Sequence, residues 1–553
     1  MPGFAPALVK VSANTDKRGG EVFGGAVVQL SSVLSDRRGA WIFVLGCAAV
    51  TAGVLMHVPM FMMGRDMHFM LAGMAMGWDM VAGMGLIVIG CLVAAYGLLP
   101  RDVAAHRAAS ESFEIAAPED AHLGPAHWGL MAVLVVALII DIMKPAALGF
   151  TVPGMIMEYG VPKATVSLVP FFALLGTVTG SVVWGVLADI YGRKASILLS
   201  AVMFVGTSIC GAMPSLAWNI GMCFMMGAAA GGMLPVTYAL LAEMTPSKHR
   251  GWSLVLVGGL GAVGGYFAAS GASALLQPIF GWRILWLLNL PTGLLLVLLG
   301  VFIPESAKFL LARGRRAEAA AVMARFGSTV KKVAAPKAAE SGAKAHVPLT
   351  GAKLIGKLTA LSIAALAWGL INFGLLLWLP ADLVSKGYSV AVSSKLLAAS
   401  ALIAFPTVFV CAFIYSRWST KWSLVTVIGI TLLGLVGVMW LELSGSGSPV
   451  LPVALLIVGS NGIIAILLPY TAESFPMRVR GRATGWVAAC TKAGGVLAQL
   501  LSITALVPAM GWAAIAIMVP TLIALGLVAW FGRETRGSDL RRLDEAMDEP
   551  LIA

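Results

Sequence analysis

The segment Ala242-Glu243-Met244-Thr245-Pro246-Ser247-Lys248-His249-Arg250-Gly251 recurs 230 positions later as Ala472-Glu473-Ser474-Phe475-Pro476-Met477-Arg478-Val479-Arg480-Gly481. Both copies have the form A-E-x-x-P-x-x-x-R-G, and each lies between two long apolar runs. An internal repeat in a hydrophobic chain is typical of secondary transporters, in which two similar halves rock about a pseudo-symmetry axis. The repeat therefore predicts two matching halves and a transport function.

The composition places most of the chain in lipid. Of its 553 residues 59% are hydrophobic and 12% are charged, and the mean hydropathy is +0.91, whereas soluble domains carry about 25% charged residues. The first 38 residues are polar and mixed, so no cleavable signal peptide is predicted. The formal charge of +12 does not predict nucleic-acid binding, because Lys and Arg concentrate in a subset of loops. The six cysteines lie in apolar segments without a C-x-x-C pair, so neither disulfides nor a zinc site are predicted.

Fourteen apolar segments are candidates for transmembrane helices, each of which needs about 20 residues. They lie near 40–63, 78–99, 128–150, 165–188, 195–213, 216–242, 252–276, 283–303, 354–379, 393–415, 422–442, 450–471, 482–506 and 511–531. The sequence therefore predicts an all-α membrane protein with two six-helix bundles and two extra helices ahead of them. The predicted parts are a tail at 1–38, the extra pair at 39–100, a linker at 101–126, bundles at 127–303 and 353–532, a connector at 304–352, and a tail at 533–553.

The connector 304–352 is rich in Arg, Lys, Ala and Glu, as is typical of a cytoplasmic loop. An even number of predicted helices separates it from both ends of the chain. We therefore expect both termini to be cytoplasmic in a multi-pass protein of the plasma membrane.

A short loop follows the second helix of the first bundle and reads Gly185-Val186-Leu187-Ala188-Asp189-Ile190-Tyr191-Gly192-Arg193-Lys194. Glycines permit a tight turn, and an acid four residues before a base can form an ion pair. The alternative is that the loop only anchors positive charge at the membrane surface. The string as a whole resembles the signature loop of the major facilitator superfamily between its second and third helices.

Further strings support the resemblance, which covers about residues 127–540. Residues 304–315 (P-E-S-A-K-F-L-L-A-R-G-R) resemble the exit of the sixth helix in sugar porters and metabolite:proton symporters, and residues 533–537 (R-E-T-R-G) resemble the ending of their twelfth helix. In that family the loop acids and bases form a latch between helices that holds one conformation. The resemblance therefore implies gating roles for residues on the loop and on both repeats. These residues are Gly185, Asp189, Gly192, Arg193, Lys194, Glu243, Arg250, Glu473 and Arg480.

The chain also departs from the family pattern. The second-half counterpart of the signature loop, residues 415–421, lacks its Gly and Asp, and Cys223 stands where the fourth helix often has an arginine. Residues 258–265 lack the proline that drug:proton antiporters carry in the fifth helix, which argues against multidrug efflux.

The first helix of the first bundle contains Asp141-Ile142-Met143-Lys144-Pro145-Ala146-Ala147-Leu148-Gly149-Phe150-Thr151-Val152-Pro153. It resembles the first helix of aromatic-acid:proton symporters, except that Lys144 replaces their second acid. At about 1.5 Å rise per residue, Asp141 lies roughly 20 Å in from Trp128, within a hydrocarbon layer of about 30 Å. Residues three apart share a helix face, so Asp141 and Lys144 can pair, and Pro145 should kink or unwind the helix there.

Charges inside the membrane are costly and usually functional. We expect Asp141 to couple transport to protons: a substrate carboxylate on Lys144 would remove the partner of Asp141 and add a like charge, so that Asp141 takes up a proton with the substrate. The alternative is an ion pair that only fixes packing.

Lys492 is a second buried cation, about ten residues, or roughly 15 Å, into the eleventh helix. It is a candidate second clamp for a carboxylate, or its ammonium reaches to the membrane interface. Other polar or aromatic groups at similar depth are candidate substrate contacts, although each also fits an interhelical hydrogen bond or a packing role. They are Trp368 and Asn372 in the seventh helix, Asn461 in the tenth and Gln499 in the eleventh.

The extra helix pair is rich in methionine, with ten Met residues between Met56 and Met84 beside His57 and His68. Thioether and imidazole ligands suit Cu(I), so copper handling is one hypothesis. The other is that methionine fills a lipid or helix contact, and it is favoured because no paired Cys accompanies the run.

Together these features predict a secondary active transporter that moves a small organic solute, a carboxylate, by proton symport with alternating access. The alternatives are a proton-coupled transporter of a sugar or neutral metabolite, and a membrane sensor or receptor that keeps the fold without transport. An ATP-driven pump is disfavoured because no G-x-x-x-x-G-K-[ST] string occurs. We expect no enzyme activity, catalytic residue, metal or cofactor, no nucleic-acid partner, and a monomer whose partners are the organic anion, protons and the lipid bilayer.

Overall fold

The computed structural model of the protein describes residues 37–99, 113–116, 122–300, 302–312, 315–327, 329–332, 352–445, 447–475, 477–504, 506 and 509–536. Nearly all elements in these ranges are helices, and thirteen of them are long and apolar enough to cross a membrane. The all-α membrane fold is thereby confirmed. The segment predicted at 283–303 forms a shorter apolar stretch, Ile284–Gly300, so the count of fourteen spans is not confirmed.

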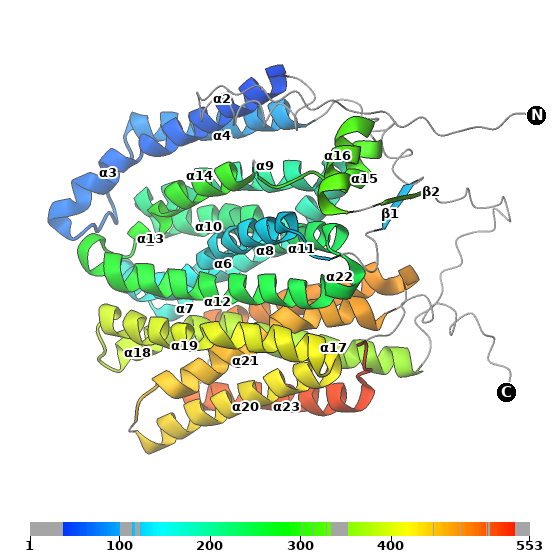
Figure 1. The fold of residues 1–553 in the computed structure, drawn as a ribbon. Helices are drawn as coiled ribbons and strands as arrows, with labels where there is room; N and C mark the ends of the chain where they lie inside the picture. The colour runs from blue at the N-terminus through cyan, green and yellow to red at the C-terminus, as the bar shows by residue number, and fades with distance from the viewer. Residues whose placement is uncertain are drawn as a thin grey trace, which may run out of the picture.

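The first half of the chain forms the upper part of Figure 1, with the extra pair at its edge. The pair consists of α2 (Arg37–Leu55), α3 (Val58–Met63), the turn η1 (Gly64–Met67) and α4 (Trp78–Leu98). It is followed by α6 (Pro125–Tyr159), α7 (Lys163–Val166), α8 (Leu168–Tyr191), α9 (Arg193–Gly206), the turn η2 (Thr207–Ala212), α10 (Leu216–Ala230), α11 (Met233–Met244), α12 (Ser247–Phe280), α13 (Ile284–Leu287) and α14 (Asn289–Gly300).

The second half forms the lower part of Figure 1. Two short helices, α15 (Ala307–Ala312) and α16 (Arg316–Phe326), precede it. It comprises α17 (Ala352–Leu370), the π-turn η3 (Ile371–Leu375), α18 (Leu376–Ser385), α19 (Val390–Arg417), α20 (Thr420–Ser444), α21 (Val450–Ser474), α22 (Met477–Ile503) and α23 (Met510–Phe531). We call the end at which α14 finishes and α17 begins, on the right of Figure 1, the connector side, and the opposite end the far side.

Two short strands interrupt the helical pattern. Strand β1 (Phe113–Ala116) pairs antiparallel with β2 (Thr329–Lys332), so that the predicted linker and the predicted connector meet. No strand was predicted there. Much of 1–38, 101–126, 304–352 and 533–553 lies outside the described residues, so these domain boundaries stay predictions.

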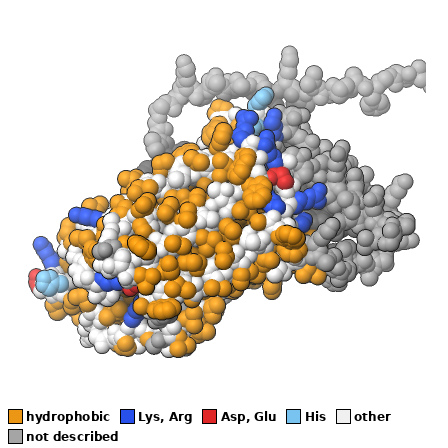
Figure 2. Space-filling model, turned by 90° about the horizontal axis from the view of Figure 1, so that it is seen from below, with side chains coloured by type: hydrophobic (Ala, Val, Ile, Leu, Met, Phe, Trp, Pro, Cys, Tyr) orange, Lys and Arg blue, Asp and Glu red, His pale blue; other side chains and the backbone are white. Residues whose placement is uncertain are grey.

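The surface divides as a bilayer requires. Figure 2 shows apolar side chains across the middle of one face and Lys and Arg toward its two ends. The halves meet along α12 and α19, α6 and α18, and α8 and α22. One apolar core contains residues of both halves, including Phe150 and Ala401. The extra pair packs on α9, and its Met60 and Met80 are buried in that contact, in line with the packing hypothesis for the methionines.

Candidate functional site

A cavity of about 410 Å³ lies between the two halves, within the range of small-molecule sites. Its walls come from α6, α8, α10, α11 and α12 of the first half and from α17, η3, α18, α21 and α22 of the second. Val182, Leu468 and Gly485 line it and belong to the connector-side parts of their helices, so the cavity extends toward that side. Its polar and aromatic lining residues are Asp141, Thr177, Ser181, Tyr238, Tyr266, Trp368, Asn372, Phe373, Asn461, Thr491 and Lys492.

The cavity brings together two of the predicted charges. Asp141 on α6 and Lys492 on α22 both line it, and each lies within electrostatic reach of the other. The Lys492 ammonium lies 5.3 Å from the centroid of the Phe373 ring, a cation–π distance. The acid and the base of the cavity therefore come from opposite halves of the chain.

No direct ion pair joins Asp141 to Lys144 in this structure, although the two groups, which can share a helix face, lie within electrostatic reach of each other. Lys144 is 1% exposed, its ammonium has no hydrogen-bond partner, and it lies against the Phe204 ring of α9. It also borders a small separate pocket with Trp286. Three residues along a helix correspond to a rotation of about 300°, so the two side chains leave the helix about 60° apart. The long Lys144 side chain extends away from the cavity.

Aromatic and amide groups shape the second-half wall. Asn372 and Phe373 lie in the π-turn η3, a helix distortion that is frequent at functional sites. Gln499 does not line the cavity: it is fully buried and its amide donates to the Phe373 carbonyl, so it supports the turn. The Trp368 indole donates to the Ser460 carbonyl at 2.8 Å, which fixes its ring in the wall, and Asn461 lines the cavity as predicted.

The far side of the cavity is closed by contacts between the halves. A Cβ atom added to Gly149 of α6 would lie 2.7 Å from the Leu377 carbonyl oxygen of α18, so the two backbones touch. Two serine pairs also bridge the halves. These are Ser167 with Ser502 at 2.6 Å and Ser273 with Ser394 at 2.7 Å.

Three of the quoted motifs meet on the connector side of the first half. Gly192 has φ +101° and leaves room for Glu305, whose carboxylate would lie 2.6 Å from an added Cβ. Glu305 accepts the first backbone N–H groups of α9, from Arg193 at 3.0 Å and Lys194 at 3.5 Å, and so caps that helix. Burial raises the pKa of Glu305, although these N–H groups favour its charged form. Arg193 forms an ion pair with Glu243 at 3.2 Å.

The second half repeats this plan with different residues. Glu534 accepts the Thr420 backbone N–H at 2.9 Å and caps α20. Burial opposes the charge of Glu534, but hydrogen bonds from the start of α20 outweigh it and lower its pKa to about 2. Glu473 accepts from the Tyr415 hydroxyl at 2.7 Å and from the Thr535 hydroxyl at 2.9 Å. Tyr415, near the end of α19, and Thr535 are thus two hydroxyl donors to Glu473, whereas Glu243 of the first half pairs with the Arg193 guanidinium.

Sequence reasoning did not single out the capping acids Glu305 and Glu534. A signal was present, because Glu305-Ser306 and Glu534-Thr535 form the same E-[ST] pair after the last helix of each half. The two copies of the A-E-x-x-P-x-x-x-R-G repeat also touch, since a Cβ at Gly251 would lie 2.7 Å from the Glu473 carboxylate. Tyr238 and Tyr266 line the cavity and were likewise not predicted.

The other predicted gating residues are less informative. The side chains of Asp189 and Arg480 lie outside the described part of the chain. Gly185 has open space where a Cβ would lie, so close packing does not require a glycine there. Among the described residues no group of three or more His, Cys, Asp and Glu side chains could hold a metal.

Known proteins resemble the chain in sequence and in fold. The family model described as Major Facilitator Superfamily matches residues 130–498. The niacin transporter NiaP of Acinetobacter baylyi is 24% identical over 440 residues, which are 77% of this chain and 98% of that protein. The 4-hydroxybenzoate transporter PcaK of Pseudomonas putida is 30% identical over 432 residues, which are 72% of this chain and 90% of that protein.

A solved structure of the proton:xylose symporter XylE, bound to 6-bromo-6-deoxy-D-glucose, aligns with a TM-score of 0.61. The alignment covers 76% of this chain and 98% of that chain at 17% identity. At this identity the likeness concerns the fold alone.

Proposed function

The chain belongs to the Major Facilitator Superfamily, and from this premise we propose that it moves a small aromatic carboxylate across the membrane by proton symport. Its family and its relatives are transporters rather than enzymes. The observation that carries the substrate class is the ammonium of Lys492 in a cavity whose wall also contains Trp368 and Phe373. An ammonium binds a carboxylate, and aromatic side chains stack on a planar ring. The names of NiaP and PcaK agree with this class.

Coupling follows from the two charges of the cavity. In the proposed mechanism the empty cavity holds Asp141 as a carboxylate and Lys492 as an ammonium, and these two groups lie within electrostatic reach of each other. A substrate carboxylate that binds Lys492 neutralises the charge of the ammonium and places a second negative charge near Asp141. Asp141 then takes up a proton, because a like charge disfavours a second carboxylate in a low-dielectric site. Both the empty and the fully loaded cavity are then neutral, whereas substrate or proton alone leaves a net charge that opposes movement through the bilayer.

Alternating access would follow from rocking of the two halves about the cavity. In this structure the serine pairs and the Gly149–Leu377 contact hold the far side. On the connector side Gly251 of the first half approaches Glu473 of the second, and Arg193 pairs with Glu243 within the first half. We assign the gating role to these contacts. The basic residues of the connector support a cytoplasmic connector side and cytoplasmic termini, in a plasma membrane like that of the bacterial relatives.

The test is uptake into proteoliposomes. Radiolabelled 4-hydroxybenzoate and nicotinate should accumulate when an inward proton gradient is imposed, and xylose should neither accumulate nor compete. Asp141→Asn should retain substrate counterflow but lose the stimulation by the gradient. Asp79→Asn, which alters an exposed acid on the extra pair, should behave as wild type.

Each alternative has its own outcome in this assay. Accumulation of the sugar with no effect of organic acids would assign a neutral substrate and remove the role of Lys492. Absence of counterflow with every compound, from protein that binds a ligand, would assign a sensor. Equal dependence on the proton gradient in wild type and Asp141→Asn would sink the coupling role of Asp141.

A further inference from the structure

The helices α2 and α4 of the extra pair lie in close backbone contact. A Cβ at Gly46 would lie 2.5 Å from the Ala94 nitrogen, and one at Gly90 would lie 2.8 Å from the Val50 nitrogen. Glycines recur every seven residues on both helices, which places them on one face and lets the backbones approach. These glycines are Gly39, Gly46 and Gly53 on α2 and Gly83, Gly90 and Gly97 on α4.

The pair covers the third helix of the first bundle. In the most apolar window of the span Arg193–Ala212, which contains α9, 94% of the residues are buried, whereas the value for the corresponding span Thr420–Ser444 of the second half is 39%. Ile87 of α4 and Val50 of α2 face Gly206 of α9. The pair is therefore packed as a part of the first half. The loop between α3 and α4 is held in place on that half.

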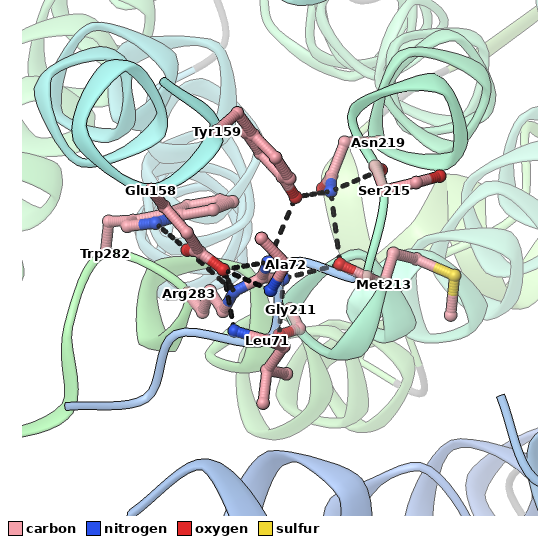
Figure 3. Close-up of polar contacts among 10 residues, drawn as sticks. All are labelled: Leu71, Ala72, Glu158, Tyr159, Gly211, Met213, Ser215, Asn219, Trp282 and Arg283. Carbon is pink, nitrogen blue, oxygen red and sulfur yellow. Dashed lines mark hydrogen bonds and ion pairs between the residues drawn. The ribbon is translucent and has the colours of Figure 1, made fainter. Parts of the chain in front are cut away.

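The loop between α3 and α4 docks on one carboxylate at the far side, as Figure 3 shows. Glu158, in the last turn of α6, accepts the backbone N–H groups of Leu71 at 2.7 Å and Ala72 at 2.9 Å. The same carboxylate accepts the Trp282 indole N–H at 2.7 Å and forms an ion pair with Arg283 at 2.7 Å. One acid thus joins the extra pair, α6 and the segment between α12 and α13.

The cluster is buried and saturated with hydrogen bonds. The side chains of Arg283 and Glu158 are 0% and 2% exposed. Arg283 also donates to the Met213 carbonyl at 2.6 Å and to the Tyr159 hydroxyl at 3.0 Å. A buried ion pair is held firmly when its remaining donors are satisfied, and it is disrupted when one partner is removed. The cluster is therefore a rigid anchor.

The helix that ends at this anchor is weak in its middle. α6 contains Pro145 and Pro153, and each proline removes a backbone hydrogen bond and favours a bend. Between them, Gly149 makes the far-side contact with Leu377. Without an anchor at its end, this part of α6 could bend away from the first half by itself.

We propose that Glu158 is a positioning residue that ties the far-side part of α6 to the extra helix pair, so that this proline-weakened gate segment moves with the first half as one body. The extra pair then acts as a brace for the gate. The inference takes alternating access from the proposed function, but its test uses no substrate, so the two can fail separately.

The experiment measures a distance across the far-side gate in the full-length protein. Spin labels at Met157→Cys on α6 and Val392→Cys on α19, both exposed positions, are introduced after replacement of the six native cysteines. Pulsed electron paramagnetic resonance without substrate should give one dominant distance in the otherwise wild-type protein. Glu158→Gln, which keeps the shape but removes the charge, should add a second, longer population.

A second variant separates the brace from general destabilisation. Ala72→Pro removes one N–H donor to Glu158 at an exposed loop position and leaves the ion pair with Arg283 in place. It should also add the longer population. Glu442→Gln is the matched control, because it breaks an exposed far-side ion pair with Lys386 that does not touch α6. The proposal is overturned if Ala72→Pro, or a folded Glu158→Gln protein, gives the same distance distribution as the control.

Discussion

Replacement of Lys492 by glutamine is the sharpest perturbation of the proposed site. Glutamine is shorter than lysine and keeps a hydrogen-bond donor. The substitution removes the one ammonium that lines the cavity among the described residues. Two charges about 4 Å apart interact with about 4 kcal/mol at an effective dielectric constant of about 20. Loss of one partner from a desolvated charge pair costs about 2–5 kcal/mol in binding. We therefore expect the substrate to lose about 2–4 kcal/mol, which raises Kd about 30- to 900-fold.

The assay is isothermal titration of purified protein with 4-hydroxybenzoate and nicotinate at one fixed pH. Lys492→Arg keeps the charge and should recover part of the affinity. Lys395→Gln is the control, because Lys395 is exposed on α19, and surface changes are usually within about 0.5 kcal/mol, or roughly a factor of two. Lys144→Gln should stay closer to wild type than Lys492→Gln, because Lys144 does not line the cavity.

The reasoning about the carboxylate clamp is refuted if Lys492→Gln binds these acids within a factor of about two of wild type, the range of a surface change. A large loss with Lys144→Gln and none with Lys492→Gln would instead restore the carboxylate site that the sequence predicted at Lys144.

Three further predictions concern the gates, the extra pair and pH. Gly149→Val should abolish most uptake while leaving the protein monodisperse, because its side chain would meet the Leu377 carbonyl; Gly129→Val, at an open position, is the control, and equal uptake by both variants would contradict the contact. Gly46→Val should lower the melting temperature measured by nanoscale fluorimetry, because it forces α2 from α4; an unchanged value would contradict their close packing. The charge of Glu534, whose pKa is about 2, should stabilise the protein above about pH 4.5, the ordinary pKa of a glutamate, and this contribution should be lost as the pH falls from there toward 2. Glu534→Gln should therefore differ from wild type in melting temperature at pH 7 and converge with it in acid.

The helical fold could be predicted because hydrophobic length alone decides it. A segment of about 20 apolar residues has few options in lipid other than a helix, and the predicted positions of Asp141 and Lys492 in the cavity follow from the cost of an intramembrane charge. The same reasoning did not show that Lys144 lies outside the cavity lining. Depth and spacing are visible in sequence, but the direction of a long side chain depends on neighbours such as Phe204, which lies on another helix.

The arrangement of residues in the second-half wall of the cavity was harder to predict from the sequence. The π-turn at Ile371–Leu375 has no periodic signal in sequence, so the support that Gln499 gives to it could not be separated from a direct ligand contact. The capping acids Glu305 and Glu534 were visible as repeated strings, but only the folded chain brings each to the start of a helix that lies far away in sequence. A short sequence motif does not show which distant segment of the chain it will contact.

Under the proposed function, the two charges of the cavity link the coupling of substrate and proton to the movement of the halves. Because Asp141 belongs to the first half and Lys492 to the second, their attraction acts across the interface that must rearrange during transport. A carboxylate on Lys492 with a proton on Asp141 replaces that attraction by two locally neutral groups, one in each half. Under the proposed function, binding therefore changes the force between the halves as well as the charge of the site. A repeat with identical charges in both halves could not do this, which gives a physical reason for the difference between them.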